Sequence, residues 1–544
     1  MSKTKIHRRS FLQLAAIGAG GAALLPSAAA AKVAAEFSKD NVRLGNIFAY
    51  GYQDGPYKLP PGPHLFIDWR YVYPGIVGWK SADGKDAALF SYDQVDDIRG
   101  TPFKVPYGIK LVPQMAEKIG PILPNNRDWE FLFGCATLLD LRGKYGLWYE
   151  VVPPRNQGMS SLLCYAESDD ALNWKKPDLG LVEFNGSKAN NIVLSSDQCP
   201  YKNFHGDSVF LDPNAAPEER FKVIFWTKNV PKETLSRLRE ENPESITPYG
   251  TREDCGMLLG TSPDGFKWKF SDKPLYSHVG DTQTCVDYDP FLKRWVLLSR
   301  TFAMGRRAIC RAETADLTRW PAPEICLWPP ADGDPSDDLY LNAKSLYPGS
   351  QTMHLAFVTM YRRRADTTAI RLASSMDSAL WGWLPGEILQ PGSPGSWDGG
   401  CVFALRGLSE IPSDRVVLPY SGYVHPHKYP RFGHVGQIGL ASWTRERIVA
   451  LQADEDGEFW TPDLFLPPGQ QLHLNFDVRR AGYIRVEVEG VDGRKQADCD
   501  PLFGNALKKQ VTWKGNASLG AENGKPTSLR FRMRSAKLFS FEVK

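Results

Sequence analysis

The chain has 544 residues, of which 42% are hydrophobic and 23% charged, and it contains 16 Trp, 48 Gly and 41 Pro. Apart from the many tryptophans this is ordinary globular composition, which excludes a disordered or fibrous protein. Lys and Arg number 65 and Asp and Glu number 62, giving a net charge of +3. Such a balance offers no electrostatic basis for binding nucleic acid or anionic lipid, and we expect neither as a partner.

The first 31 residues have the pattern of an export signal. The basic stretch His7-Arg8-Arg9-Ser10-Phe11 precedes an apolar run rich in Ala and Gly, and small residues follow from Pro26 to Ala31. Paired arginines followed by Phe-Leu are typical of a twin-arginine signal. We therefore expect the twin-arginine export machinery as a partner and a periplasmic or extracellular mature chain. No later stretch is long and apolar enough to form an integral membrane segment.

The cysteines and the catalytic motifs argue against bound groups. Nine cysteines are scattered without a Cys-x-x-Cys pair, and a twin-arginine substrate folds in the reducing cytosol before export. We therefore expect buried thiols rather than a disulfide framework or a zinc site. The chain also lacks a P-loop, a dinucleotide-binding fingerprint, an HExxH motif and a GxSxG elbow. The sequence predicts no metal and no cofactor.

Short strand-like runs dominate the chain, and helical periodicity is nearly absent. These runs are rich in aromatic and branched residues and are bounded by Gly, Pro, Asp or Asn, which indicates an all-β fold. One charged stretch, 232–244, is expected to hold a short surface helix. Examples of the expected strands are Ser161–Ala166, Phe221–Trp226, Arg294–Leu298 and His354–Val358.

A repeated pattern suggests how many sheets there are. Ser/Thr-x-Asp-x-x-x-Trp begins at Ser168, Ser262, Thr314 and Ser375, and Ala441-Ser442-Trp443 is a degenerate fifth copy. The hydroxyl residue would end a strand, the Asp would cap the turn, and the Trp would anchor the next strand between sheets. Five such units favour a five-bladed β-propeller over unrelated hairpins in a sandwich.

The predicted domain organisation follows from these patterns. After the signal, Pro- and Gly-rich residues 32–128 are expected to form an N-terminal extension that wraps the propeller. Residues 129–455 would form the five-bladed β-propeller. Alternating strands with Gly-rich turns in 456–544 predict a C-terminal β-sandwich.

Acidic residues lie near the expected start of the first strand in every blade. They are Glu130, Asp207, Asp281, Asp338 and Asp398. First strands line the channel of a propeller, so these acids would converge on one mouth. Crowding separates their pKa values, as cleavage of a glycosidic bond by an acid and a base or nucleophile requires. We expect Asp281 and Asp207 to be the catalytic pair, with Asp398 or Glu130 as a third acid. Simple turn caps are the alternative.

Other side chains near the same mouth could bind a carbohydrate. Aromatic rings stack on sugar faces, and histidine, amide and guanidinium groups orient hydroxyls. Arginines at strand ends, at 300, 306–307 and 362–364, could bind the carboxylate or sulfate of an acidic sugar, unless they are simply solvated. The expected substrate-binding residues are His205, Gln283, Arg300, Tyr340, Trp397 and His425.

The segment Leu65-Phe66-Ile67-Asp68-Trp69-Arg70 resembles the Leu-Phe-(Val/Ile)-Asp-Asp opening of exported bacterial proteins similar to glycoside hydrolase families 32 and 43. The resemblance covers nearly the whole mature chain. It implies a five-bladed propeller followed by a β-sandwich, with three channel acids acting as nucleophile or base, transition-state stabiliser and general acid. It adds Asp68 to the candidate binding residues. The match continues through Leu163–Ser168, Trp174–Gly180, Asn190–Val193, Val209–Pro213, Gly280–Gln283, Asp338–Tyr340, Trp397-Asp398, Gly524–Pro526 and Phe531–Phe541.

Together these observations predict a secreted glycoside hydrolase that cleaves fragments of plant or algal polysaccharides. Two alternatives remain open. The first is a non-catalytic glycan-binding protein on the same scaffold, which needs aromatic and arginine side chains but no acid pair. The second is a lyase acting on uronate-containing glycans, with His205 or Tyr340 as base and an arginine that neutralises the carboxylate.

Overall fold

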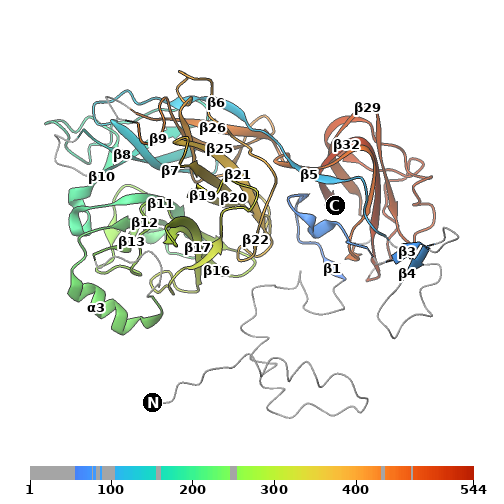
Figure 1. The fold of residues 1–544 in the computed structure, drawn as a ribbon, viewed down its shortest axis with the longest axis horizontal. Coiled ribbons are helices and arrows are strands. Elements are labelled where there is room, and N and C mark those ends of the chain that lie inside the picture. Colours follow the sequence, from blue (N-terminus) through green and yellow to red (C-terminus); the bar gives the residue numbers. More distant parts are fainter. Residues whose placement is uncertain are drawn as a thin grey trace, which may run out of the picture. The chain divides into compact units, whose positions relative to one another are not determined.

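The computed structural model describes residues 56–75, 78–80, 86–88, 104–154, 161–245, 254–429, 435–466, 470–522 and 524–544. These belong to one compact unit, Asn46–Lys544, and the predicted signal peptide lies outside them. The described chain is almost entirely β-structure, which confirms the predicted all-β class (Figure 1). Its one α-helix within these ranges, α3 (Lys232–Glu241), lies where a helix was predicted. None of the described helices has the length and apolar character to cross a membrane.

Four antiparallel sheets follow one another along the chain, each with its four strands in sequential order. The first contains β7 (Leu132–Asp140), β8 (Tyr145–Val152), β9 (Leu162–Ser168) and β10 (Ile192–Ser195). The second contains β11 (His205–Leu211), β12 (Phe221–Thr227), β13 (Gly256–Ser262) and β14 (Lys269–Phe270). The third contains β15 (Cys285–Asp289), β16 (Arg294–Ala303), β17 (Arg306–Thr314) and β18 (Glu324–Leu327). The fourth contains β19 (Asp337–Leu346), β20 (His354–Arg362), β21 (Thr367–Ser375) and β22 (Trp381–Trp383).

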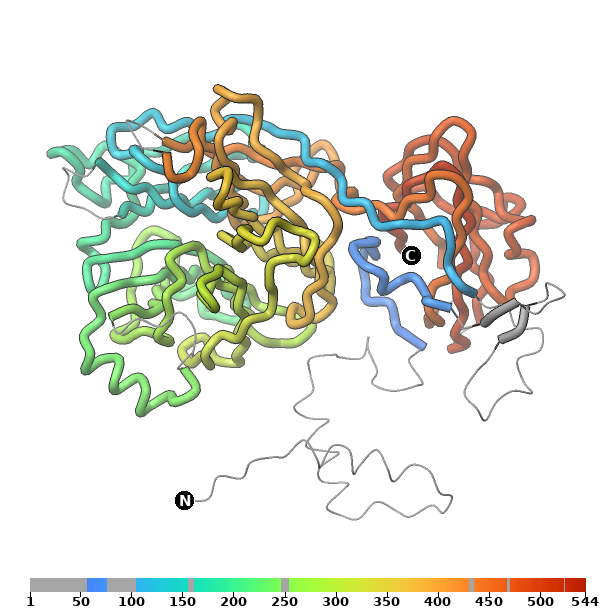
Figure 2. Tube along the Cα trace, viewed as in Figure 1, coloured from blue at the N-terminus to red at the C-terminus, as the bar shows by residue number. Residues whose placement is uncertain are grey.

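The fifth sheet combines strands from both ends of the ring-forming sequence. It contains β23 (Cys401–Ala404), β24 (Ser409–Ile411), β25 (Arg415–Tyr423) and β26 (Gln437–Thr444). Its outer strand is β6 (Glu117–Leu123), which pairs with β26. Figure 2 shows this light-blue segment running beside the orange strands. Part of the predicted N-terminal extension therefore completes a sheet.

The five sheets are joined through their first strands. β7 contacts β11, β11 contacts β15, β15 contacts β19, and β19 contacts β23. β25 contacts β7, and the parallel bridge between Thr137 and Arg406 joins the same two sheets. The sheets thus form a closed ring with their first strands inside. We call the end where these strands begin the N-terminal mouth and the opposite end the C-terminal mouth.

The repeated sequence pattern forms the turn between the third and fourth strands of the first four sheets. After β21, Asp377 accepts hydrogen bonds from Ala379 N and Leu380 N, both at 2.9 Å. Trp381 Nε1 donates to Ser378 O at 2.9 Å. In the fifth sheet Trp443 instead donates to Gln114 O at 2.9 Å. The fifth copy is degenerate because β6, and not a following hairpin, supplies the outer strand.

The C-terminal part is built on long strands with irregular pairing along their length. β29 (Leu472–Val488), β32 (Leu529–Val543) and β27 (Val449–Trp460) lie side by side, and the predicted boundary at 455/456 falls inside β27. The rings of Phe459 and Phe531 stack at 4.7 Å in the core between them. The remaining elements are β30 (Gly504–Gln510), β5 (Lys110–Pro113) and β2 (His64–Leu65) in this sheet, β1 (Tyr57–Lys58), β28 (Leu464–Phe465) and β31 (Pro526–Thr527) in a second sheet, and the hairpin of β3 (Gly78–Lys80) and β4 (Asp86–Ala88).

All nine cysteines lie in the described ranges. None of them forms a disulfide, and eight are buried. Burial raises the pKa of these thiols; for Cys285, for example, it reaches about 11. The prediction of buried thiols is confirmed.

Candidate active site at the N-terminal mouth

Asp207 in β11 is a buried carboxyl group without a partner. Its side chain is fully buried, and neither carboxyl oxygen has a hydrogen-bond partner among the described residues. Burial, and then the negative charge of Glu150, raise the pKa of Asp207 well above its ordinary value. The preceding Gly206 has φ +68°, and a Cβ there would lie 2.1 Å from Thr282 O. Only glycine allows β11 to approach the third sheet so closely.

Next to Asp207, Glu150 and His205 form an ion pair. Glu150 is buried near the end of β8, and His205 Nδ1 lies 2.7 Å from its Oε1. Ser161 Oγ donates to the same oxygen at 3.0 Å, and Gly206 N donates to Oε2 at 3.0 Å. Burial opposes both charges. The pairing nevertheless outweighs it, so the pKa of Glu150 is lowered and that of His205 is raised. We call Glu150, His205 and Asp207 the proton-holding cluster.

Asp281 is held at the mouth by a buried arginine. Arg300 Nη2 donates to Asp281 Oδ2 at 2.9 Å and to its main-chain O at 2.7 Å. Arg300 Nη1 donates to Tyr340 O at 3.1 Å, and its guanidinium lies 4.9 Å from the Tyr340 ring centre. The Arg300 side chain is fully buried, whereas the Asp281 side chain is 50% exposed and its backbone has φ +47°. A buried cation therefore fixes a solvent-facing carboxylate.

These groups act on one another electrostatically. The charges of Asp281 and Arg300 both contribute to the pKa of His205, and the charge of Glu150 raises that of Asp207. The N-terminal mouth thus holds a protonated carboxyl, an imidazolium-carboxylate pair and an exposed carboxylate in a single group. Acid–base catalysis needs such a separation of proton-donating and ionised groups.

The fourth sheet adds two arginines to this mouth. Asp338 Oδ2 accepts from Arg307 Nη1 at 2.7 Å and from Arg363 Nε at 2.6 Å. Burial raises the pKa of Asp338, but these hydrogen bonds outweigh it and the pKa is lowered. The Tyr340 ring lies 5.3 Å from the Arg307 guanidinium and 4.8 Å from the ring of His427. Asp338 is therefore ionised and already bound.

Two of the other predicted acids are fully engaged by the fold. Glu130 is buried and paired with Lys176 at 2.7 Å, and it accepts hydrogen bonds from the backbone of the loop before β7. Asp398 is buried, paired with Lys118 at 2.7 Å, and accepts from Tyr420 OH at 3.0 Å. The structure does not bring either acid into contact with the proton-holding cluster.

Gln283 lies inside the ring, where it joins sheets. Its Nε2 donates to Ala136 O at 2.8 Å and to Asp207 O at 2.9 Å. Its Oε1 accepts from Arg406 N at 3.1 Å. Gln283 therefore connects the first, second, third and fifth sheets and supports the backbone of Asp207.

The predicted aromatic and histidine residues of the fifth sheet lie elsewhere. The Trp397 ring packs at 5.3 Å from that of Tyr420. His425 is exposed and stacks at 4.6 Å on Tyr429. Neither makes a hydrogen bond or ion pair with the cluster in the part of the chain that the structure describes.

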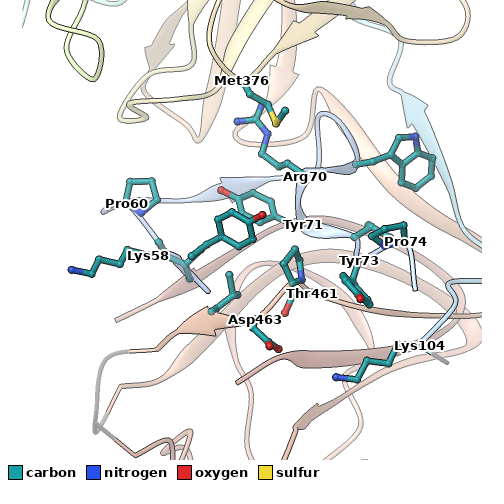
Figure 3. A pocket seen from close by; sticks show the side chains of 16 residues that line it. Lys58, Pro60, Arg70, Tyr71, Tyr73, Pro74, Lys104, Met376, Thr461 and Asp463 are labelled. Carbon is teal, nitrogen blue, oxygen red and sulfur yellow. The ribbon is translucent and has the colours of Figure 1, made fainter. Parts of the chain in front are cut away.

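Asp68 belongs to a different region. It accepts from Arg70 N at 2.9 Å and pairs with the Arg70 guanidinium at 2.6 Å. Arg70 borders a cavity of about 510 Å³, whose lining includes Trp69, Tyr73 and Asp463. Figure 3 shows Arg70 directed toward Met376 in this cavity, with the aromatic side chains below it. The cavity shares no lining residue with the N-terminal mouth.

The C-terminal mouth contains a hollow of about 690 Å³ with a different charge arrangement. Asp287 at its wall pairs with Arg406 at 2.5 Å and with Lys344 at 3.1 Å. Arg406 also donates to Val209 O at 2.5 Å and to Val286 O at 2.7 Å. This arginine closes the ring by joining the fifth sheet to the second and third.

The sequence analysis missed Glu150, Asp287 and Arg406. Glu150 lies in the second strand of its sheet, and the search covered only the starts of first strands. Its signal was a single acid within the apolar run Tyr145–Val152. Asp287 and Arg406 lie at the opposite ends of first strands, where no acid–base chemistry was expected. Within the described ranges no group of three or more His, Cys, Asp or Glu side chains is placed to hold a metal ion.

Comparison with known proteins gives distant similarities only. No family model matches the chain, and no curated protein matches it. Among solved structures, an N-acetylgalactosamine deacetylase from F. plautii in complex with blood group B trisaccharide has a TM-score of 0.42 at 12% identity, covering 63% of this chain and 97% of its own. A thermostable family-43 glycoside hydrolase scores 0.41 at 12% identity, with coverages of 62% and 96%. The catalytic domain of the Coprinopsis cinerea GH62 α-L-arabinofuranosidase scores 0.40 at 12% identity, with coverages of 61% and 97%.

Proposed function

We propose that the ring is a five-bladed β-propeller followed by a C-terminal β-sandwich, and that its N-terminal mouth hydrolyses glycosidic bonds. The five consecutive antiparallel sheets with touching first strands support the propeller. Within the mouth, the unequal states of Asp207, Glu150 and Asp281 support the chemistry. Export through the twin-arginine signal in residues 1–31 is part of the same proposal.

The observation that carries this proposal is the partnerless buried carboxyl of Asp207. Buried polar groups are nearly always hydrogen-bonded, so an exception at the mouth of a ring points to a functional proton. We infer that Asp207 stores the proton that protonates the leaving oxygen. His205, two residues nearer the mouth and 32% exposed at its side chain, is the member of the cluster that reaches solvent. Asp281 supplies the carboxylate that activates water or attacks the sugar.

Purified variants test these roles. Release of reducing ends from a panel of plant and algal glycans is measured for the wild type, Asp207→Asn and Asp281→Asn. Each variant is expected to lose activity by about 10²–10⁴-fold, since each removes an acid–base group. Asp398→Asn, in which the acid held by Lys118 and Tyr420 is changed, is the matched control and keeps its turnover number. Undiminished rates in Asp207→Asn and Asp281→Asn would contradict the mechanism.

A second function, a lyase acting on uronate-containing glycans, is favoured by one contact. His205 Nδ1 faces Glu150 at 2.7 Å, so its Nε2 is the ring nitrogen left to act on a substrate. A carboxylate orients the imidazole of many general bases in this way. A lyase leaves an unsaturated product that absorbs in the ultraviolet, whereas hydrolysis leaves none. Retention of glycans without either product would instead indicate a binding protein.

A further inference from the structure

We propose that the N-terminal mouth binds an anionic sugar unit, recognising a carboxylate or sulfate ester with a cluster of arginines from the third and fourth sheets. The arginine cluster comprises Arg300, Arg306, Arg307 and Arg363. This inference rests on the proposed glycan function and names the substrate class of that same site.

Strand ends bring the cluster together around one tyrosine. Arg300 ends the inner part of β16, Arg307 lies opposite Phe302 at the start of β17, and Arg363 follows β20. Arg300 and Arg307 have their guanidinium groups 4.9 and 5.3 Å from the Tyr340 ring centre. The tyrosine ring thereby holds two cations on the side of the mouth that carries Asp281.

The cluster contains more cations than carboxylates to neutralise them. Arg307 and Arg363 share a single carboxylate oxygen of Asp338, at 2.7 and 2.6 Å. Arg306 donates to two main-chain carbonyls, at 2.7 Å to Asp337 O and at 2.5 Å to Pro335 O. Neutral acceptors do not cancel a charge, so the region retains a positive surplus. The neighbouring Arg362, by contrast, pairs with Glu387.

Exposure separates the ligand-facing arginines from the positioning one. The Arg363 side chain is 46% exposed and that of Arg307 is 19% exposed, whereas Arg300 is fully buried. Arg307 and Arg363 therefore contact the anion, and Arg300 holds Asp281 and Tyr340 in place. A planar guanidinium presents paired N–H donors that match the two oxygens of a carboxylate or sulfate.

The position of the cluster fixes where the anionic group would sit on the substrate. Arg300 links the cluster directly to Asp281, and the charge of Asp281 also acts on His205. A sugar whose anion rests on Arg307 and Arg363 would therefore lie beside the reacting groups. The anionic unit is thus part of the sugar at or next to the cleaved bond, and not a distant residue of the polymer.

Binding to a catalytically silent protein tests this inference separately from turnover. Isothermal titration of Asp207→Asn uses two matched probe pairs: oligogalacturonide with its carboxyl-reduced form, and a sulfated galactan oligosaccharide with its desulfated form. At least one anionic probe is expected to bind ten-fold or more tightly than its neutral partner. The pair that shows the difference identifies carboxylate or sulfate as the recognised group.

A second substitution assigns the preference to the cluster. Adding Arg307→Gln or Arg363→Gln is expected to remove most of the preference for the anion while leaving neutral binding unchanged. Arg371→Gln is the matched control, because Arg371 also pairs with an acid, Asp332 at 3.0 Å, and lies 5.5 Å from the Trp383 ring, away from the mouth. Two separate variants keep the test valid if one fails to fold.

Equal affinity for both members of each pair would overturn the inference, and so would a preference that survives both cluster variants. Absence of binding by all four probes would overturn it as well. None of these results decides the proposed function, because release of reducing ends from neutral glycans by the wild type is a separate measurement.

Discussion

The two mouths of the ring are built from opposite ends of the same five first strands, yet they treat their acids differently. At the C-terminal mouth, burial opposes the charge of Asp287, but Lys344 and Arg406 lower its pKa to about 2. At the N-terminal mouth, nothing in the described chain pairs with Asp207, and burial with the charge of Glu150 raises its pKa. One mouth is electrostatically satisfied and the other is not.

This difference separates a structural acid from a chemical one. A carboxylate with two cations stabilises the ring and has no proton to give at neutral pH. A carboxyl that is buried without a partner costs stability, and such a cost is characteristic of functional sites. Acidic residues at the ends of inner strands are therefore not equivalent, and substitutions at the two mouths are expected to have opposite effects.

The largest expected effect is the loss of activity in Asp207→Asn, by about 10²–10⁴-fold. The same variant is expected to be more stable than the wild type at neutral pH. The folded-state pKa of Asp207 is raised above 3.8, so the wild type loses stability as pH rises from about 4 toward that raised pKa. Asn does not titrate and avoids this loss. Glycan turnover and thermal unfolding at several pH values measure both effects, and a destabilised variant at pH 7 would contradict this account.

The opposite outcome is expected at the other mouth. Asp287→Asn leaves Arg406 and Lys344 as nearly buried cations without a counter-charge. The free energy of unfolding should fall by about 3 kcal/mol, as when one partner of a buried ion pair is removed. Activity per folded molecule should not change. Denaturant unfolding and active-site titration check the two parts, and a catalytic defect in the folded fraction would show that the mouths are coupled.

An intermediate effect is expected from Glu150→Gln, which removes the partner of His205. The folded pKa of Glu150 lies below 4.5 and that of His205 above 6.5. The pair thus stabilises the protein most between these values, less as pH falls through the pKa of Glu150, and less as pH rises through that of His205. The variant should lose about 2 kcal/mol near pH 5.5. A stability difference that does not vary with pH would argue against an ion pair.

The smallest effect is expected outside both mouths. Asp377→Ala removes two backbone hydrogen bonds from the turn after β21. We expect a loss of about 1 kcal/mol in unfolding free energy and unchanged activity, since Asp377 caps a turn and touches no mouth residue. Thermal unfolding provides the measurement. A large loss of activity would place this turn nearer the chemistry than the structure does.

The sequence was sufficient for features that depend on local chemistry. The turn pattern at Ser375 and Asp377 needs only neighbouring residues, and its copies identified the first four sheets. β6 was not recognised because its partner β26 lies more than 300 residues away, and no local pattern records that pairing. Residue positions also could not distinguish Asp207 from Asp398. Both are buried acids near a first strand, but Lys118, which neutralises Asp398, comes from a remote segment.

The central claim is that Asp207 remains protonated at neutral pH. Infrared difference spectroscopy between the wild type and Asp207→Asn measures this directly, because only a protonated carboxyl shows the carboxylic acid C=O band. We predict that the band is present at pH 7 in the wild type and in Asp281→Asn, and absent in Asp207→Asn. A wild-type spectrum in which the band appears only below about pH 4, where an ordinary Asp protonates, would contradict the account.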